Sequence, residues 1–163
     1  MKIRRILAPT DFSDISDRCV EQAVVLARAL GSEIVLLHAV EPVVLAGDLF
    51  GASAVVNVMD EIQRAARQGL ALRVKRLQKK RGIRCRSVLV NGTAAAVIVD
   101  AAARLRADLI MMATHGRSGL SHLFLGSVAE RVVRTSRCPV LTVPATNARV
   151  RKTARRRTQR PAA

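Results

Sequence analysis

The segment 113–128 gathers the residue types that bind anions. It contains three glycines, four hydroxyl-bearing residues and one arginine, Arg117. Glycines let backbone N–H groups approach an anion closely, and a helix that begins near Ser127 would add unpaired N–H donors and a partial positive charge. The segment therefore predicts a cradle for phosphate groups. The alternative is an ordinary connection with glycine turns, which is usually shorter.

Asp11 lies in a second polar segment, residues 9–13, which follows an apolar run near the start of the chain. A carboxylate there could accept hydrogen bonds from a sugar hydroxyl or help to hold a divalent cation. It could equally cap, together with Ser13, the helix expected to follow. Position alone leaves both interpretations open. His38 lacks partners at metal-ligand spacing, and we expect it to pack in or beside the sheet.

Standard catalytic and nucleotide motifs are missing. There is no GxxxxGK[ST], no GxGxxG after the first apolar run and no GxSxG. His115 and His122 are seven residues apart without a neighbouring cysteine, so we do not expect them to hold a metal. The sequence predicts no catalytic residue and no protein-held metal site.

Strand-like and helix-like patterns alternate along the chain. Apolar runs predict strands at 3–8, 33–40, 84–90, 108–113 and 139–143, and the intervening periodicity predicts helices at 14–30, through 55–77, at 94–105 and at 127–135. Ser13 and Gly31 frame the first helix as N-cap and C′ residue. This order predicts a three-layer, doubly wound (Rossmann-like) α/β domain with a five-stranded parallel sheet and about four helices. Such sheets bind ligands beyond the carboxyl ends of their strands, where 9–13 and 113–128 would meet.

The charge of the chain is strongly positive and unevenly placed. Lys and Arg total 28 against 12 Asp and Glu, a net charge of +16. Seven of the basic residues lie in 149–160, so we divide the chain into a folded domain, 1–145, and a disordered basic tail, 146–163. Ten more lie in 64–86 without an acidic residue, and we expect them to form a solvated helix face. With no Trp or Tyr and three Phe, the chain lacks the aromatic platforms of single-strand nucleic-acid proteins.

Cysteine usage and hydropathy indicate the compartment. Three cysteines without a CxxC pair argue against a disulfide framework and a zinc ribbon, which favours reduced thiols. No apolar segment reaches the ~18 residues of a membrane span, and the first residues do not form a signal-peptide core. We therefore expect a cytoplasmic protein without a membrane partner.

Over its first 145 positions or so, the chain resembles the universal stress protein family. The ATP-binding members carry G-x2-G-x9-G-(S/T) after the fourth strand, and Gly116, nine residues, then Gly126 and Ser127 match its second half. Ala113 replaces the first glycine of the motif. The segments 9–13, 36–40 and 137–141 also look like the family.

The resemblance implies an ATP site, with Mg²⁺ or Mn²⁺ accompanying the nucleotide. By position, Asp11 would contact the ribose or the metal side, and the Ala39 backbone would meet adenine. Pro9 and Thr10 would shape the same wall. The phosphates would lie against Gly116, Gly126, Ser127 and Val128, with Arg117 beside them. The resemblance also implies a homodimer in which the last strand, 140–143, pairs across a twofold axis.

Three functions are compatible with the sequence. The first is a stress-response or signalling module that holds ATP, which needs no catalytic base. The second is a slow ATPase or phosphotransferase, for which only Arg117, Ser118 and Ser121 are candidates near the γ-phosphate. The third is salt-dependent binding of nucleic acid or another polyanion by the basic tail, with or without help from the basic face at 64–86. Its alternative is a solubilising, disordered extension without a specific partner.

Overall fold

The computed structural model describes residues 2–42, 51–114 and 126–144 of the chain. Five parallel strands form one sheet in the order β3-β2-β1-β4-β5. The strands are β1 (Arg5–Pro9), β2 (Glu33–Val40), β3 (Cys85–Asn91), β4 (Leu109–Ala113) and β5 (Val140–Val143). The helices are α1 (Asp14–Leu30), α2 (Gly51–Arg81), α3 (Ala94–Arg104) and α4 (Ser127–Thr135). The predicted α/β fold class is confirmed, with strand ends that differ from the expectation by one or two residues.

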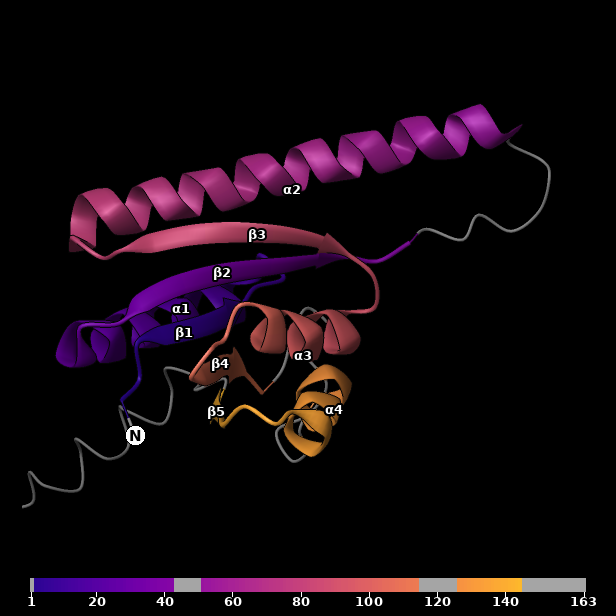
Figure 1. Ribbon diagram of the computed structural model, residues 1–163. Coiled ribbons are helices and arrows are strands. Elements are labelled where there is room, and N and C mark those ends of the chain that lie inside the picture. Colours follow the sequence, from indigo (N-terminus) through magenta and orange to yellow (C-terminus); the bar gives the residue numbers. More distant parts are fainter. Residues whose placement is uncertain (1, 43–50, 115–125, 145–163) are drawn as a thin grey trace, which may run out of the picture.

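Two helices cover each face of the sheet (Figure 1). One core packs α1 and α2 against residues such as Ile6, Ile34 and Leu36. The other packs α3 and α4 against the alternate residues, including Leu7 and Val35. The helices that follow the neighbouring strands β1 and β4 diverge, because α1 packs on one face of the sheet and α4 on the other. That divergence is the topological switch point at which open α/β sheets bind ligands.

Helix α1 begins and ends at the predicted caps. The Ser13 hydroxyl accepts a hydrogen bond from the Ser16 N–H, and Gly31 adopts a left-handed conformation with φ of 67°. The helical spacing of Ile15, Cys19, Ala23, Leu26 and Leu30 predicts one apolar face for this helix, and the prediction is only partly right. Cys19 and Ala23 are buried, but Leu30, expected beside them, is 43% exposed. The helix packs across β1, β2 and β4, so a wider face is buried, including Val20, Val24 and Ala27.

Helix α2 runs beyond the end of β3 in its N-terminal part (Figure 1). The series that predicted this helix is Val55, Met59, Ile62, Ala66, Leu70, Val74 and Leu77. Of these residues, Ala66, Leu70 and Leu77 are buried, whereas Ile62 is 36% exposed. The amphipathic pattern therefore marks contact with the sheet only from Ala66 onward. None of the described helices combines the length and apolarity needed to cross a membrane. The tail, 146–163, lies outside the described residues.

Candidate functional site

A cavity of about 360 Å³ opens at the carboxyl ends of β1, β2 and β4. The N-termini of α3 and α4 close its other side. Eight of the ten residues predicted for the site line it; they are Pro9, Thr10, Asp11, Ala39, Ala113, Gly126, Ser127 and Val128. The other two, Gly116 and Arg117, lie outside the described residues, as do Ser118, Ser121, His115 and His122.

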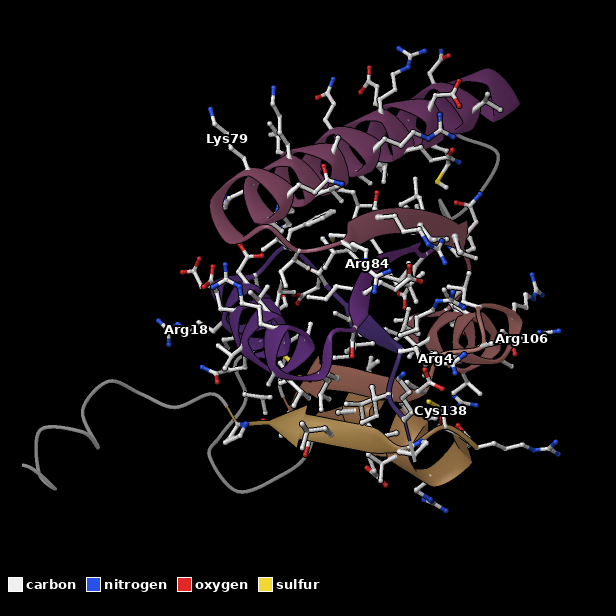
Figure 2. The ribbon with its side chains drawn as sticks, turned by 60° about the vertical axis from the view of Figure 1, so that its left-hand side comes forward. Arg4, Arg18, Lys79, Arg84, Arg106 and Cys138 are labelled. Carbon is white, nitrogen blue, oxygen red and sulfur yellow. The ribbon has the colours of Figure 1, made fainter. Side chains whose placement is uncertain are left out.

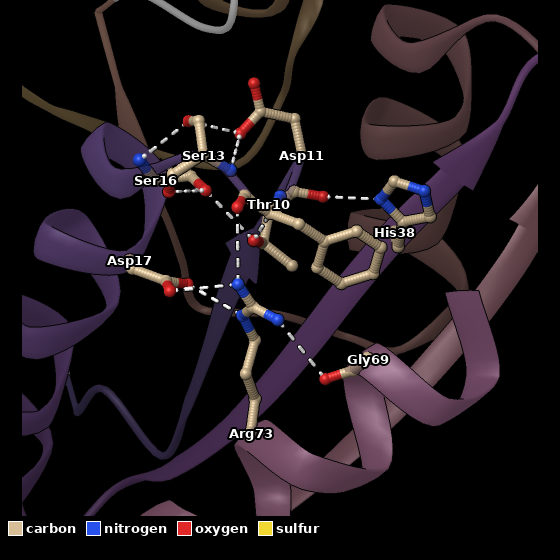
Figure 3. Close-up of polar contacts among 9 residues, drawn as sticks. Thr10, Asp11, Ser13, Ser16, Asp17, His38, Gly69 and Arg73 are labelled. Carbon is tan, nitrogen blue, oxygen red and sulfur yellow. Dashed lines mark hydrogen bonds and ion pairs between the residues drawn. The ribbon is translucent and has the colours of Figure 1, made fainter. Parts of the chain in front are cut away.

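The connection from β1 to α1 is held by a dense set of hydrogen bonds (Figure 3). The buried Thr10 hydroxyl lies 3.0 Å from the Ser16 hydroxyl and accepts from the Phe12 N–H at 3.1 Å. Asp11 Oδ1 accepts from both the N–H and the hydroxyl of Ser13, at 3.0 and 2.6 Å. Ser13 is the residue that caps α1, so Asp11 orients the cap and also lines the cavity. The sequence left two roles open for Asp11, contact with a ligand and support of the helix cap. These two roles are geometrically compatible.

Phe12 adopts a left-handed backbone conformation in this connection, with φ of 67°. Such a conformation costs roughly 1 kcal/mol or more for a residue with a side chain, so surrounding contacts must hold it. The Phe12 ring stacks on His38, with ring centroids 4.2 Å apart. His38 Nδ1 donates to the Thr10 carbonyl at 2.7 Å, which fixes the ring beside the connection. Gly69 leaves room for the Phe12 ring, because a Cβ at this position would lie 3.3 Å from the nearest atom of that ring.

Arg73 on α2 completes the support of Phe12 (Figure 3). Its guanidinium carbon lies 4.7 Å from the centre of the Phe12 ring, and its Nη2 donates to the Phe12 carbonyl at 3.3 Å. The same group donates to both carboxylate oxygens of Asp17, at 2.7 and 2.9 Å. Arg73 belongs to the basic cluster 64–86 that the sequence assigned to a solvated face. That expectation is wrong for Arg73, whose side chain is only 18% exposed.

The opposite wall is formed by the end of β4 and the start of α4. The Thr114 N–H donates to the Val143 carbonyl at 3.0 Å, and the Thr114 carbonyl accepts from the Gly126 N–H at 2.7 Å. Gly126 is the N-cap of α4, and as a glycine it has no side chain that could cap the helix. The first N–H groups of an α-helix have no partner within it, so those after Gly126 face the cavity as donors for an anion. Ala113 ends β4 without a positive φ, so its methyl group causes no backbone strain there.

Some lining residues were not predicted from the sequence. Ile98, Ala94, Leu37 and Met112 give the cavity an apolar side, and Ser16, His38 and Thr114 add to its polar side. The sequence marked strand ends and glycines, whereas Ala94 and Ile98 come from α3, whose position depends on its packing against β2. Their i, i+4 spacing was a usable signal, because it places both on one helix face.

The described cysteines are thiols placed away from this cavity. Burial raises the pKa of the Cys19 thiol to about 12, and burial together with the Glu33 charge raises the pKa of Cys85 to about 11. Burial also raises the pKa of Cys138. Raised values keep thiols protonated and unreactive. Within the described ranges, no group of three or more His, Cys, Asp or Glu side chains is arranged to hold a metal ion.

Comparisons with a family model and with known proteins both lead to one family. Residues 2–144 match the model of the universal stress protein family. The chain is similar to universal stress protein MJ0531 of Methanocaldococcus jannaschii, with 32% identity over 140 residues, covering 86% of this chain and 81% of that protein.

Solved structures share the fold. The structure of MJ0577, also from M. jannaschii, superposes with a TM-score of 0.71 at 25% identity, covering 91% of this chain and all of that one. A universal stress protein from Archaeoglobus fulgidus, solved in complex with dAMP, gives a TM-score of 0.59 at 22% identity, covering 87% and 98% of the two chains.

Proposed function

The chain belongs to the universal stress protein family, and on that premise we propose that it is a nucleotide-binding module whose ligand is ATP. The observation that carries this proposal is the cavity at the switch point of the sheet. It pairs an apolar side, with Ala39, Ile98 and Met112, against the N-terminus of α4, whose N-cap is a glycine. An adenine ring needs an apolar environment, and phosphates need the N–H donors and partial positive charge of a helix N-terminus.

The position of each strand and helix around the cavity indicates which part of ATP it would contact. Ala39, at the end of β2, would meet adenine through its backbone, while Pro9 and Thr10 shape the adjoining wall. The phosphates would lie against Gly126, Ser127 and Val128, together with Gly116 and Arg117. The dAMP complex of the A. fulgidus protein supports an adenine nucleotide as the ligand class.

Mg²⁺ or Mn²⁺ is proposed to enter with the nucleotide. Asp11 supplies the one carboxylate among the described lining residues. Mg²⁺ is usually bound through one or two carboxylates together with substrate phosphates and water, so this donor set fits a cation brought by ATP. When bound, the cation would neutralise phosphate charge beside Asp11, and Asp11 could also accept from a ribose hydroxyl.

A binding role is favoured over efficient catalysis. Phosphoryl transfer needs a residue that positions water or an acceptor in line with the leaving oxygen. Among the described lining residues, the Asp11 carboxylate is already engaged by Ser13, and the His38 ring is held against Phe12 and Thr10. We therefore propose a cytoplasmic stress-response or signalling module, with slow ATP hydrolysis or phosphotransfer as the alternative.

The module is proposed to form a homodimer through β5. The two edges of the sheet differ in a way that supports this. β3 carries Arg86 on its edge and is covered by α2, whereas β5 exposes Leu141 to 42% and has no charged residue. Unprotected apolar edges favour pairing with another strand, and isologous pairing is the commonest form.

The proposal is tested by asking what the purified protein carries. The protein is denatured, and the released small molecules are identified by chromatography and mass spectrometry. Release of ATP supports the proposal. A protein that releases no nucleotide, and that also fails to bind added Mg-ATP, contradicts it. A turnover assay at saturating Mg-ATP separates the module from the enzyme, because a module hydrolyses ATP very slowly or not at all.

A further inference from the structure

A row of cationic side chains lies at the amino ends of the parallel strands, on the side of the sheet opposite the cavity. We propose that this row, the basic edge, binds the phosphodiester backbone of duplex nucleic acid without sequence preference. Its members are Lys2 and Arg4 before β1, Arg84 before β3, Arg106 before β4 and Arg137 before β5. Figure 2 shows Arg84, Arg4 and Arg106 across this edge.

The acidic groups at the basic edge are already engaged. Glu33 pairs with Arg5 and lies 3.9 Å from Arg86. Asp108 Oδ2 accepts from the backbone N–H groups of Arg4 and Arg5, at 2.8 and 2.9 Å. Within the described part of the chain, no carboxylate is ion-paired with the side chains of Lys2, Arg4, Arg106 or Arg137. Their charges are therefore available to an external anion.

The surface is hollowed at this edge. A second cavity of about 290 Å³ is lined by Lys2, Arg4, Arg5 and Arg84, with Glu33 as its one described acidic residue. Arg84 donates to the Gly31 carbonyl at 2.9 Å, which holds its guanidinium at the rim. A phosphate group at the hollow would meet the side chains of Lys2, Arg4 and Arg84, whereas Arg5 is turned inward toward Glu33 and the Leu105 carbonyl.

Arg106 adopts a left-handed backbone conformation that is unfavourable for a residue with a side chain. It follows α3 with φ of 51°, and the Ala107 N–H donates back to the Ala102 carbonyl at 2.9 Å, the pattern of a left-handed helix end. Glycine is the usual residue there because a side chain costs roughly 1 kcal/mol. An exposed arginine at this position is a poor choice for folding, which supports a role in contacting something outside the domain.

The dimensions of the basic edge suit an extended polyanion. Neighbouring strands lie about 4.8 Å apart, so the row from β3 to β5 crosses four spacings, or about 19 Å. Each strand of a duplex carries one phosphate for about every 3.4 Å of helix axis, so about five or six phosphates of each strand lie within this span. The five described cations are Lys and Arg alone, without an aromatic ring or amide to read a base. Contact with phosphates positions a protein but carries no sequence information, which predicts binding without preference.

The basic edge and the ATP cavity occupy opposite ends of the same strands. The inference therefore does not depend on the proposed function, and it differs from binding by the tail, 146–163. The proteins tested keep the tail, so that binding by the tail and binding by the basic edge are compared within one full-length chain.

Two triple variants of the full chain test the inference. The edge variant carries Arg4→Gln, Arg106→Gln and Arg137→Gln, and the control carries Arg64→Gln, Lys75→Gln and Arg76→Gln on the exposed face of α2. Both lose three charges from exposed positions. Affinity for two duplex DNAs of unrelated sequence is measured by fluorescence anisotropy over a range of salt concentrations.

We expect the edge variant to reduce the slope of log K against log salt by about 3, because each phosphate that is no longer neutralised reduces the slope by about 0.9. The control should change the slope by less than about 1. Equal reductions in both variants, an unchanged slope in the edge variant, or an affinity difference above about tenfold between the two duplexes would overturn the proposal. Binding of inorganic polyphosphate without binding of either duplex would also overturn it.

Discussion

The guanidinium of Arg73 lies over the ring of Phe12, 4.7 Å from its centre, while its Nη2 donates to the Phe12 carbonyl. The two residues are 61 positions apart, and the contact joins α2 to the connection between β1 and α1. Because Asp11 and Thr10 adjoin Phe12 in that connection, Arg73 positions one wall of the candidate nucleotide site from outside it.

Replacing Arg73 tests this support. Arg73→Met keeps much of the side-chain length but removes the cation and the paired donors to Asp17. We expect the free energy of unfolding to fall by about 2 kcal/mol, from the sum of a cation–π contact and charge-assisted hydrogen bonds, part of it screened at this partly exposed site. We also expect Mg-ATP affinity to fall several-fold. Denaturant unfolding and calorimetric titration measure the two effects.

Arg76→Met is the matched control, because Arg76 is exposed on the same helix. It should leave both the stability and the affinity nearly unchanged. Arg73→Lys restores the charge without the paired geometry and should recover only part of the stability and part of the affinity. Equal effects of Arg73→Met and Arg76→Met would show that Arg73 does not hold the connection.

Arg106→Gly should make the domain more stable. Glycine relieves the left-handed backbone at φ of 51°, so the free energy of unfolding should rise by about 0.5 to 1 kcal/mol. Thermal or denaturant unfolding measures the gain, with Arg104→Gly as a control that should destabilise α3, since Arg104 is its last helical residue. A loss of stability on Arg106→Gly would mean that the arginine side chain contributes to folding.

Leu141→Lys should disrupt self-association through β5. Leu141 is 42% exposed on a strand without charged residues, and a lysine on each copy would place like charges across the proposed twofold axis. Sedimentation velocity should show a dimer for the unaltered chain and a monomer for Leu141→Lys. Leu72→Lys, which changes another exposed leucine, on α2, should remain dimeric. If both variants sediment like the unaltered protein, β5 is not the interface.

Stability should decline in alkali because of two buried thiols. The native pKa values of Cys19 and Cys85 are raised, to about 12 and about 11, from an ordinary value of 9.0. Above pH 9 the unfolded chain loses these protons and the native chain keeps them, so their contribution is complete below pH 9 and is lost as the pH approaches 11 to 12. Each thiol should lower the free energy of unfolding by about 1.4 kcal/mol per pH unit in that window.

Denaturant titrations between pH 8 and 10.5 measure this slope, and the chain has no tyrosine to add to it. A variant with Cys19→Ala and Cys85→Ala should be less stable at pH 8 but lose less stability on going to pH 10.5. If its slope equals that of the unaltered chain, the thiols are not the cause.

The fold was predictable because its signals are local. Ser13 and Gly31 mark the ends of α1 within a few residues, and apolar runs mark each strand. Parallel strands then bring their carboxyl ends to one edge, which is why residues as distant as Asp11, Ala39 and Gly126 could be assigned to one site.

Features that depend on packing between distant elements could not be read from the sequence. Arg73 looks like any other member of a basic cluster until α2 is docked against Phe12. Leu30 fits the apolar period of α1 but is 43% exposed, because the period does not say where the packing of the helix against the sheet ends. The basic edge is dispersed over residues 2 to 137, and only the strand order brings it into one row.

The central claim, that ATP binds with its phosphates at the start of α4, is tested most directly by calorimetric titration of nucleotide-free protein with Mg-ATP. The unaltered chain should bind one ATP per chain saturably. Val128→Glu places a negative charge in the first turn of α4, which suits the helix but repels phosphates. It should leave the domain at least as stable and weaken binding by about tenfold or more, about 1.4 kcal/mol, whereas Val133→Glu in the last turn should leave affinity unchanged. Absence of saturable binding by the unaltered chain, or equal affinity in Val128→Glu, would contradict the account.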